Sequence, residues 1–154
     1  MRPTRLRLLA AMLVISAAVG WGVATLVDAY ADSPLPVPWT AALVMFLLAL
    51  ALALWARGTR ARLAGAAGTK PMDPLVAARS AALAMAASRT GAIVAGFYSG
   101  AAIAFVPSWG AAAARERILI ALVTVLGAVL VVVAALWLER VCQVPPDSSD
   151  DDKP

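Results

Sequence analysis

The chain has 154 residues, of which 62% are hydrophobic and only 14% are charged, with one Cys and no His. A soluble domain is about 45–50% apolar and about 25% charged, so the charged side chains here are too few to cover a surface that faces water. The composition excludes most soluble enzymes and binding modules, and the lack of His beside the single Cys142 excludes a disulfide, a metal cluster and a His-dependent triad.

The net charge of +4 is spread over the flanks of apolar segments and is not gathered on one face. Basic residues in such places are typical of membrane topology signals and of contacts with anionic lipid. We therefore expect the lipid bilayer and its anionic headgroups as partners, and no nucleic acid.

Four apolar runs are each long enough to cross a bilayer, which takes about 20 residues in a helix. In chain order they cover about residues 8–27, 39–56, 87–106 and 118–138. A cytoplasmic connector, 57–86, separates the second and third runs, and residues 145–154 form an acidic tail that we predict to be disordered. Backbone groups in a bilayer must be bonded internally, and no run alternates as a barrel strand does. Residues 1–144 are thus predicted to form one all-α membrane domain, a four-helix antiparallel transmembrane bundle.

The first run is also similar to an export signal, because basic residues precede it and Ala29-Tyr30-Ala31 matches a small-x-small cleavage site. Its apolar stretch of about 20 residues exceeds the roughly 7–15 of a signal core, so we expect the helix to be retained. Small residues at four-residue spacing give it a packing face, formed by Ser16, Gly20 and Ala24. The connector that follows is short, and the first two helices are therefore expected to pack side by side.

The third run carries a longer stripe of small residues at the same spacing, formed by Ser88, Ala92, Gly96, Gly100 and Ala104. Small residues let two helix backbones approach closely in lipid, either within one chain or across a homodimer. Upstream, Asp73 has the side chain of a helix cap and Pro74 suits a first helical turn. A helix from Pro74 to Val106 exceeds the hydrocarbon thickness, so it tilts, breaks or projects into the cytoplasm.

Two charges lie at or within the predicted spans, Arg89 in the third and Glu139 at the end of the fourth. Counting about 20 residues back from Trp109, at the outer interface, places Arg89 less than one turn inside the hydrocarbon and level with Glu139. We expect Arg89 to extend toward the headgroups and to pair with Glu139, with an anion-binding site as the alternative. The lone thiol of Cys142 is expected to be inert.

Basic residues are distributed unequally between the two sides of the predicted bundle. Ten of the thirteen Lys and Arg residues lie with the two termini and the 57–86 connector, and only Arg115 and Arg117 lie on the other side. By the positive-inside rule, this predicts a multi-pass protein of the cell membrane with both termini in the cytoplasm.

The run Pro71–Arg79, with the sequence PMDPLVAAR, resembles the signature of an actinobacterial family, the domain-of-unknown-function 3180 family. The opening Pro3-Thr4-Arg5, the glycines of the third run and the ending Ala135–Glu139 agree, so the resemblance covers nearly the whole chain. It implies a four-helix membrane protein, often encoded beside folate-biosynthesis genes, with no activity, ligand or catalytic residue to carry over. Many members have a Lys near the place of Met85, where this chain has Arg89 one turn later.

Catalysis requires an acid–base or nucleophile pair held together, and the sequence presents none. We therefore predict that the protein is not an enzyme and has no catalytic, cofactor-binding or metal site. It is expected to act by helix packing, as a homo-oligomer or with a membrane partner protein. The alternative is a small transporter or channel subunit for an anionic small molecule, because Arg89 lies within a span while the carboxylates lie at helix ends. The family resemblance, with its neighbouring folate genes, suggests a folate-pathway compound as that molecule.

Overall fold

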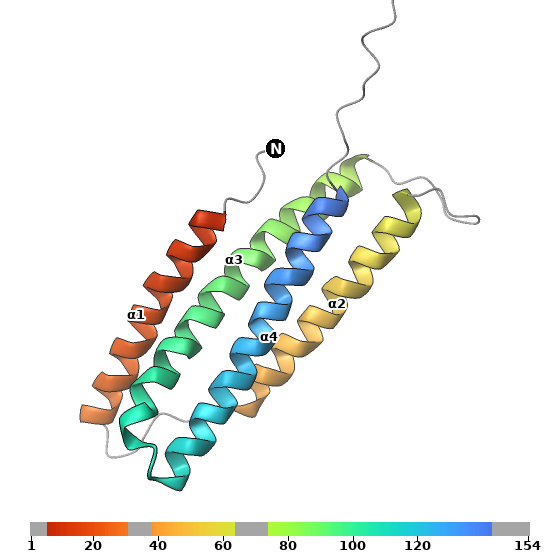
Figure 1. The fold of residues 1–154 in the computed structure, drawn as a ribbon. Helices are drawn as coiled ribbons and strands as arrows, with labels where there is room; N and C mark the ends of the chain where they lie inside the picture. Colours follow the sequence, from red (N-terminus) through yellow and green to blue (C-terminus); the bar gives the residue numbers. More distant parts are fainter. Residues whose placement is uncertain (1–5, 31–37, 64–73, 143–154) are drawn as a thin grey trace, which may run out of the picture.

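The computed structural model describes residues 6–30, 38–63 and 74–142. They form four α-helices, α1 (Leu6–Tyr30), α2 (Trp39–Leu63), α3 (Pro74–Phe105) and α4 (Ala112–Cys142), with a short 3-10 turn at Val106–Ser108. The helices run alternately down and up along the chain, and each is long and apolar enough to cross a membrane (Figure 1). The described residues include no strand, and the prediction of an all-α membrane protein with four packed helices is confirmed.

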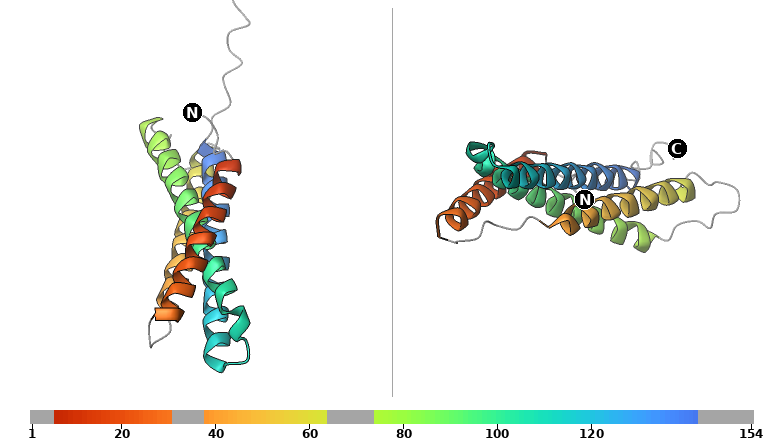
Figure 2. Two further views of the ribbon diagram at one scale, coloured as in Figure 1. Left: turned by 90° about the vertical axis from the view of Figure 1, so that its left-hand side faces the viewer. Right: turned by 90° about the horizontal axis from the view of Figure 1, so that it is seen from below.

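The four helices lie side by side in the order α1, α3, α4, α2 (Figure 1). The central pair, α3 and α4, is antiparallel, and one outer helix packs on each of its members. Each outer helix runs parallel to its inner neighbour, because α1 and α3 begin at one end of the molecule and α2 and α4 at the other (Figure 2).

This order corrects the expectation that the first two helices pack side by side, because in the described part of the chain α1 and α2 are not in contact. The eight residues 31–38 can reach about 26–29 Å when extended. That length covers roughly three helix spacings of 8–10 Å. The connector therefore leaves the order open, and the shapes of the packing faces decide it.

Alanine builds most of the contact between the helices. Stripes with a seven-residue period are buried on two of them, Ala42, Ala49 and Ala56 on α2 and Ala114, Ala121, Ala128 and Ala135 on α4. Seven residues make about two turns, so each stripe keeps to one face of its helix. The small side chains let these helices approach their neighbours closely, and close approach supplies the dispersion that holds helices together in lipid.

The third helix is a single unbroken helix of 32 residues. From the sequence, three possibilities were open for a helix longer than the bilayer is thick: a tilt, a break or a projection into the cytoplasm. The unbroken helix excludes the break. The predicted connector 57–86 is partly helical, since α2 continues to Leu63 and α3 begins at Pro74. The predicted cap Asp73 and the tail 145–154 lie outside the described residues.

Candidate functional site

The small-residue stripes of the sequence lie at the inner faces of α1 and α3. Ser16, Gly20 and Ala24 are buried, as are Ser88, Ala92, Gly96 and Gly100, while Ala104 is partly buried. A Cβ atom added at Gly20 would lie 2.8 Å from the carbonyl carbon of Phe97, and one at Gly96 would lie 3.0 Å from that of Leu13. The two backbones therefore touch along the α1–α3 seam, where side chains larger than hydrogen do not fit at these glycines.

A hydrogen bond crosses the same seam. The hydroxyl of Ser16 donates to the backbone carbonyl of Ile93 at 2.6 Å. A hydroxyl in hydrocarbon has no water to bond, so a partner on the neighbouring helix stabilises the pair of helices. Because Gly96 faces α1, the stripe on α3 is used for packing inside the chain and not for a homodimer across that face.

Two further glycines lie where the other pairs of helices, α3 with α4 and α2 with α4, approach each other closely. Neither belongs to the small-residue stripes identified from the sequence. A Cβ atom at Gly91 would lie 2.8 Å from a methyl group of Val132, in the α3–α4 seam. One at Gly127 would lie 2.9 Å from the Cβ atom of Met45, in the α2–α4 seam. The seven-residue alanine period is the sequence feature that could have revealed these two seams.

Three polar side chains are buried near the end at which α1 begins. They come from three different helices: Thr59 of α2, Ser80 of α3 and Glu139 of α4. Each lies within four residues of an apolar cluster formed by Ala56, Ala84 and Leu138. No buried side-chain nitrogen or oxygen of the described residues lacks a hydrogen-bond partner, and neither Ser80 nor Glu139 is free. The cost of burying these polar groups is therefore offset by hydrogen bonds.

Arg89 is not level with Glu139, which corrects that part of the prediction. Ala84 packs with Leu138, so the antiparallel register places Glu139 beside residue 83. Arg89 lies six residues further along α3, about 9 Å deeper at 1.5 Å per residue. Its side chain is exposed, whereas that of Glu139 is buried. Within the described residues, the structure therefore does not join the two as an ion pair.

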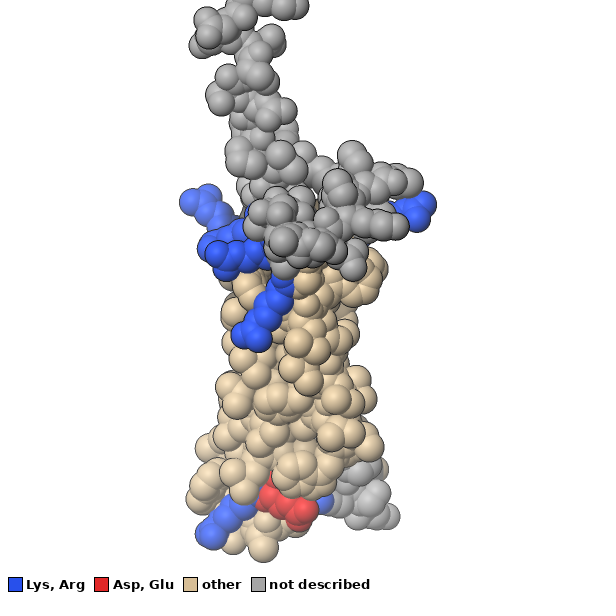
Figure 3. Space-filling view, turned by 90° about the vertical axis from the view of Figure 1, so that its right-hand side faces the viewer, with Lys and Arg blue, Asp and Glu red and all other residues tan. Residues whose placement is uncertain are grey.

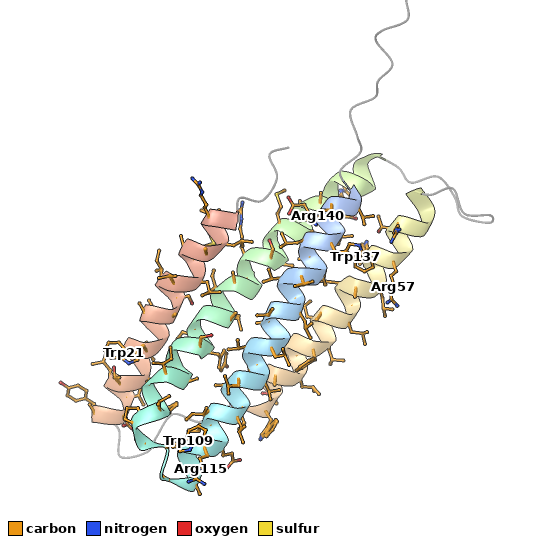
Figure 4. All side chains as sticks on the ribbon, in the orientation of Figure 1. Trp21, Arg57, Trp109, Arg115, Trp137 and Arg140 are labelled. Atoms are coloured by element: carbon orange, nitrogen blue, oxygen red, sulfur yellow. The ribbon has the colours of Figure 1, made fainter. Side chains whose placement is uncertain are left out.

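At the opposite end of the molecule, two arginines near the start of α4 contact residues at the end of α3 and in the turn that joins the two helices. Arg115 Nε donates to the carbonyl of Trp109 at 2.8 Å, and the two residues lie side by side at the lower end of the molecule (Figure 4). The guanidinium carbon of Arg117 lies 5.8 Å from the centre of the Phe105 ring, within range of a cation–π attraction. Both arginines therefore stabilise the turn.

On the face that Figure 3 shows, charged side chains gather at the two ends of the molecule, with an apolar belt between them. Among the described residues, Arg89 departs from this distribution, because it is exposed partway along α3. Exposed arginines at the end where α1 begins are Arg7, Arg57, Arg60, Arg79 and Arg140. Arg115 and Arg117 lie at the other end, with the acidic Asp28 and Glu116. This distribution is typical of a protein that spans a bilayer, because charges at mid-membrane are costly.

No three His, Cys, Asp or Glu side chains of the described residues come together as metal ligands would. Comparisons with curated proteins and with solved structures give no match. A family model described as a protein of unknown function, DUF3180, matches residues 9–146, which include nearly all of the four helices and the seams between them. The chain therefore belongs to the DUF3180 family.

Proposed function

We propose that the protein is a non-enzymatic, multi-pass protein of the cell membrane that acts by lateral packing against a partner helix. The observation that carries the proposal is the unequal burial of the four helices. In their most apolar parts, 44% of α3 and 50% of α4 is buried, but only 17% of α1 and of α2. The outer helices thus leave most of their apolar surface open to lipid and to other helices.

Helix α1 presents the face that supports a partner best. One seam holds it, and large apolar side chains cover its outer side: Val14, Ile15, Val19, Trp21 and Leu26. Trp21 is 52% exposed and lies about two and a half turns before the helix ends at Tyr30 (Figure 4). Tryptophan is among the residue types most enriched at the energetic centres of protein interfaces.

The hydroxyl groups inside the helices support packing over transport. Thr25 donates to the carbonyl of Gly22 at 2.9 Å, Ser99 to that of Ala95 at 2.7 Å and Thr124 to that of Ile120 at 2.8 Å. These donors bond the preceding turn of their own helix, as isolated hydroxyls do in hydrocarbon. A transporter or channel subunit for an anionic small molecule has Arg89 as its main support, and that side chain is exposed.

We further propose that both termini face the cytoplasm. The exposed arginines at the end where α1 begins outnumber those at the turn between α3 and α4. The side of the membrane that holds the excess of Lys and Arg is the cytoplasmic side.

Photo-cross-linking in intact membranes tests the packing role. With a photoreactive residue at Ile15, which is 66% exposed on α1, we expect one discrete intermolecular adduct. The same residue at the fully buried Ser88 is the control and should give no such adduct. The absence of an adduct from every exposed position of α1 and α2, together with uptake of an aromatic carboxylate into proteoliposomes, would overturn the proposal in favour of transport.

A further inference from the structure

An apolar groove follows the seam between α2 and α4. The part nearer the basic end has a volume of about 420 Å³ and the part nearer Trp39 about 370 Å³, and Phe46 lines both. In the larger part, α2 supplies Phe46, Leu50 and Ala53 as one wall, and α4 supplies Leu130, Val133 and Trp137 as the other. The groove therefore runs along the helices from one bilayer interface toward the other.

The α2 wall of this groove continues into two arginines. Phe46, Leu50, Ala53, Arg57 and Arg60 follow one another at spacings of three or four residues, so they share one face of the helix. Both arginines are exposed, and Arg57 directly follows Ala56, whose apolar cluster the groove residue Trp137 packs against (Figure 4). An apolar trough that leads to two cations complements a molecule with an apolar chain and an anionic head.

Helix α4 brings a third arginine to the same depth. Ala56 packs with Leu138, so the parallel register of α2 and α4 places Arg57 within one residue of the level of Arg140. Arg140 is exposed and follows Trp137 by three residues, which is about one turn. Trp137 thus lies where a ring prefers to sit, at the boundary between hydrocarbon and headgroups.

The size of the groove favours an acyl chain over a helix. Its larger part extends from Phe46 to Ala53, about 10 Å along the axis at 1.5 Å per residue. A helix about 10–12 Å across would take up roughly 800–1200 Å³ over that length. The empty space in this part of the groove, counted out to its open side, is about 780 Å³, which is below that range.

We propose that this groove binds one anionic phospholipid. An acyl chain lies against Phe46, Leu50 and Trp137, and the lipid phosphate accepts hydrogen bonds from Arg57 and Arg60. Guanidinium groups suit this role because they bind phosphate oxygens in a bidentate manner and remain charged.

Native mass spectrometry of the full chain in detergent, titrated with phosphatidylglycerol or phosphatidylcholine, tests the headgroup contact. The unaltered protein should retain one phosphatidylglycerol at lower lipid concentration than phosphatidylcholine. The double variant Arg57→Gln, Arg60→Gln should weaken phosphatidylglycerol binding about 25-fold, since each arginine near an anionic surface contributes about five-fold. Its binding of phosphatidylcholine, in which the choline cation offsets the charge of the phosphate, should weaken much less.

Matched variants separate the groove from general electrostatics. Arg79→Gln removes an exposed arginine of α3 at the same end and should leave both lipids bound as before. Ala53→Phe fills the groove and should abolish binding of both lipids, whereas Ala51→Phe, at an exposed position of α2, should not. Size-exclusion elution shows that each variant is folded. An equal loss with Arg79→Gln, undiminished binding to Ala53→Phe, or a second copy of the chain bound in place of lipid would overturn the proposal.

Discussion

Replacing Gly100 by alanine should lower the free energy of unfolding by about 1–3 kcal/mol, the usual cost of overpacking a close contact. The added Cβ atom would lie 2.7 Å from the carbonyl carbon of Ala17 and 2.8 Å from the amide nitrogen of Trp21. Both are backbone atoms of α1, so the clash is relieved only if the whole helix moves away from α3. Thermal unfolding of the detergent-purified protein, followed by size-exclusion chromatography of heated samples, measures the loss.

The matched control for this variant is Gly22→Ala on α1. A Cβ atom at Gly22 meets no atom within 4 Å, so the change alters helix propensity without touching the seam. It should leave stability unchanged or raise it by up to about 1 kcal/mol. If Gly100→Ala proved as stable as Gly22→Ala, the backbone contact between α1 and α3 would be wrong.

Replacing Ala56 by leucine should destabilise the protein by about 3 kcal/mol, toward the upper end of overpacking costs. Ala56 is completely buried and packs with Leu138 of α4, in a cluster to which Ala84 of α3 also belongs, so the added carbons find no free space between α2 and α4. The expected result is a lower unfolding temperature and release of α2 from α4, which limited proteolysis between α2 and α3 would detect.

The leucine control lies on the same helix at Ala51, which is exposed. Ala51→Leu adds the same volume on the outer side of α2 and should change stability by less than about 0.5 kcal/mol. A loss as large as that of Ala56→Leu would show that the outer and inner faces of α2 have been assigned the wrong way round.

The helices themselves could be predicted from the sequence, because hydropathy and the need to bond every backbone group in lipid determine them. The packing face of α1 was equally visible, since Ser16, Gly20 and Ala24 stand at a spacing that only one face of a helix produces. The order of the helices could not be predicted in this way. A short connector can reach past two helices, so the order depends on which faces fit each other.

The candidate sites depend on which residues of neighbouring helices lie at the same level, and counting residues along each predicted span does not show this. The predicted level of Arg89 came from counting residues back from Trp109, whereas its level relative to Glu139 follows from how α3 and α4 pack. The second span was expected to end at residue 56, which placed Arg57 and Arg60 in a connector. In the structure α2 continues to Leu63, and both arginines therefore extend the groove-lining face of a helix.

The distance between α1 and α2 tests most directly the central claim that the four helices lie in a row. Spin labels at Ala18 and Leu43, both exposed, can be placed on a Cys142→Ala background and measured by pulsed electron resonance in bilayers. With α3 and α4 between them, and neighbouring helices about 8–10 Å apart, the labelled helices should be more than about 20 Å apart. A separation of about 10 Å, as in a bundle closed by contact between α1 and α2, would contradict the account.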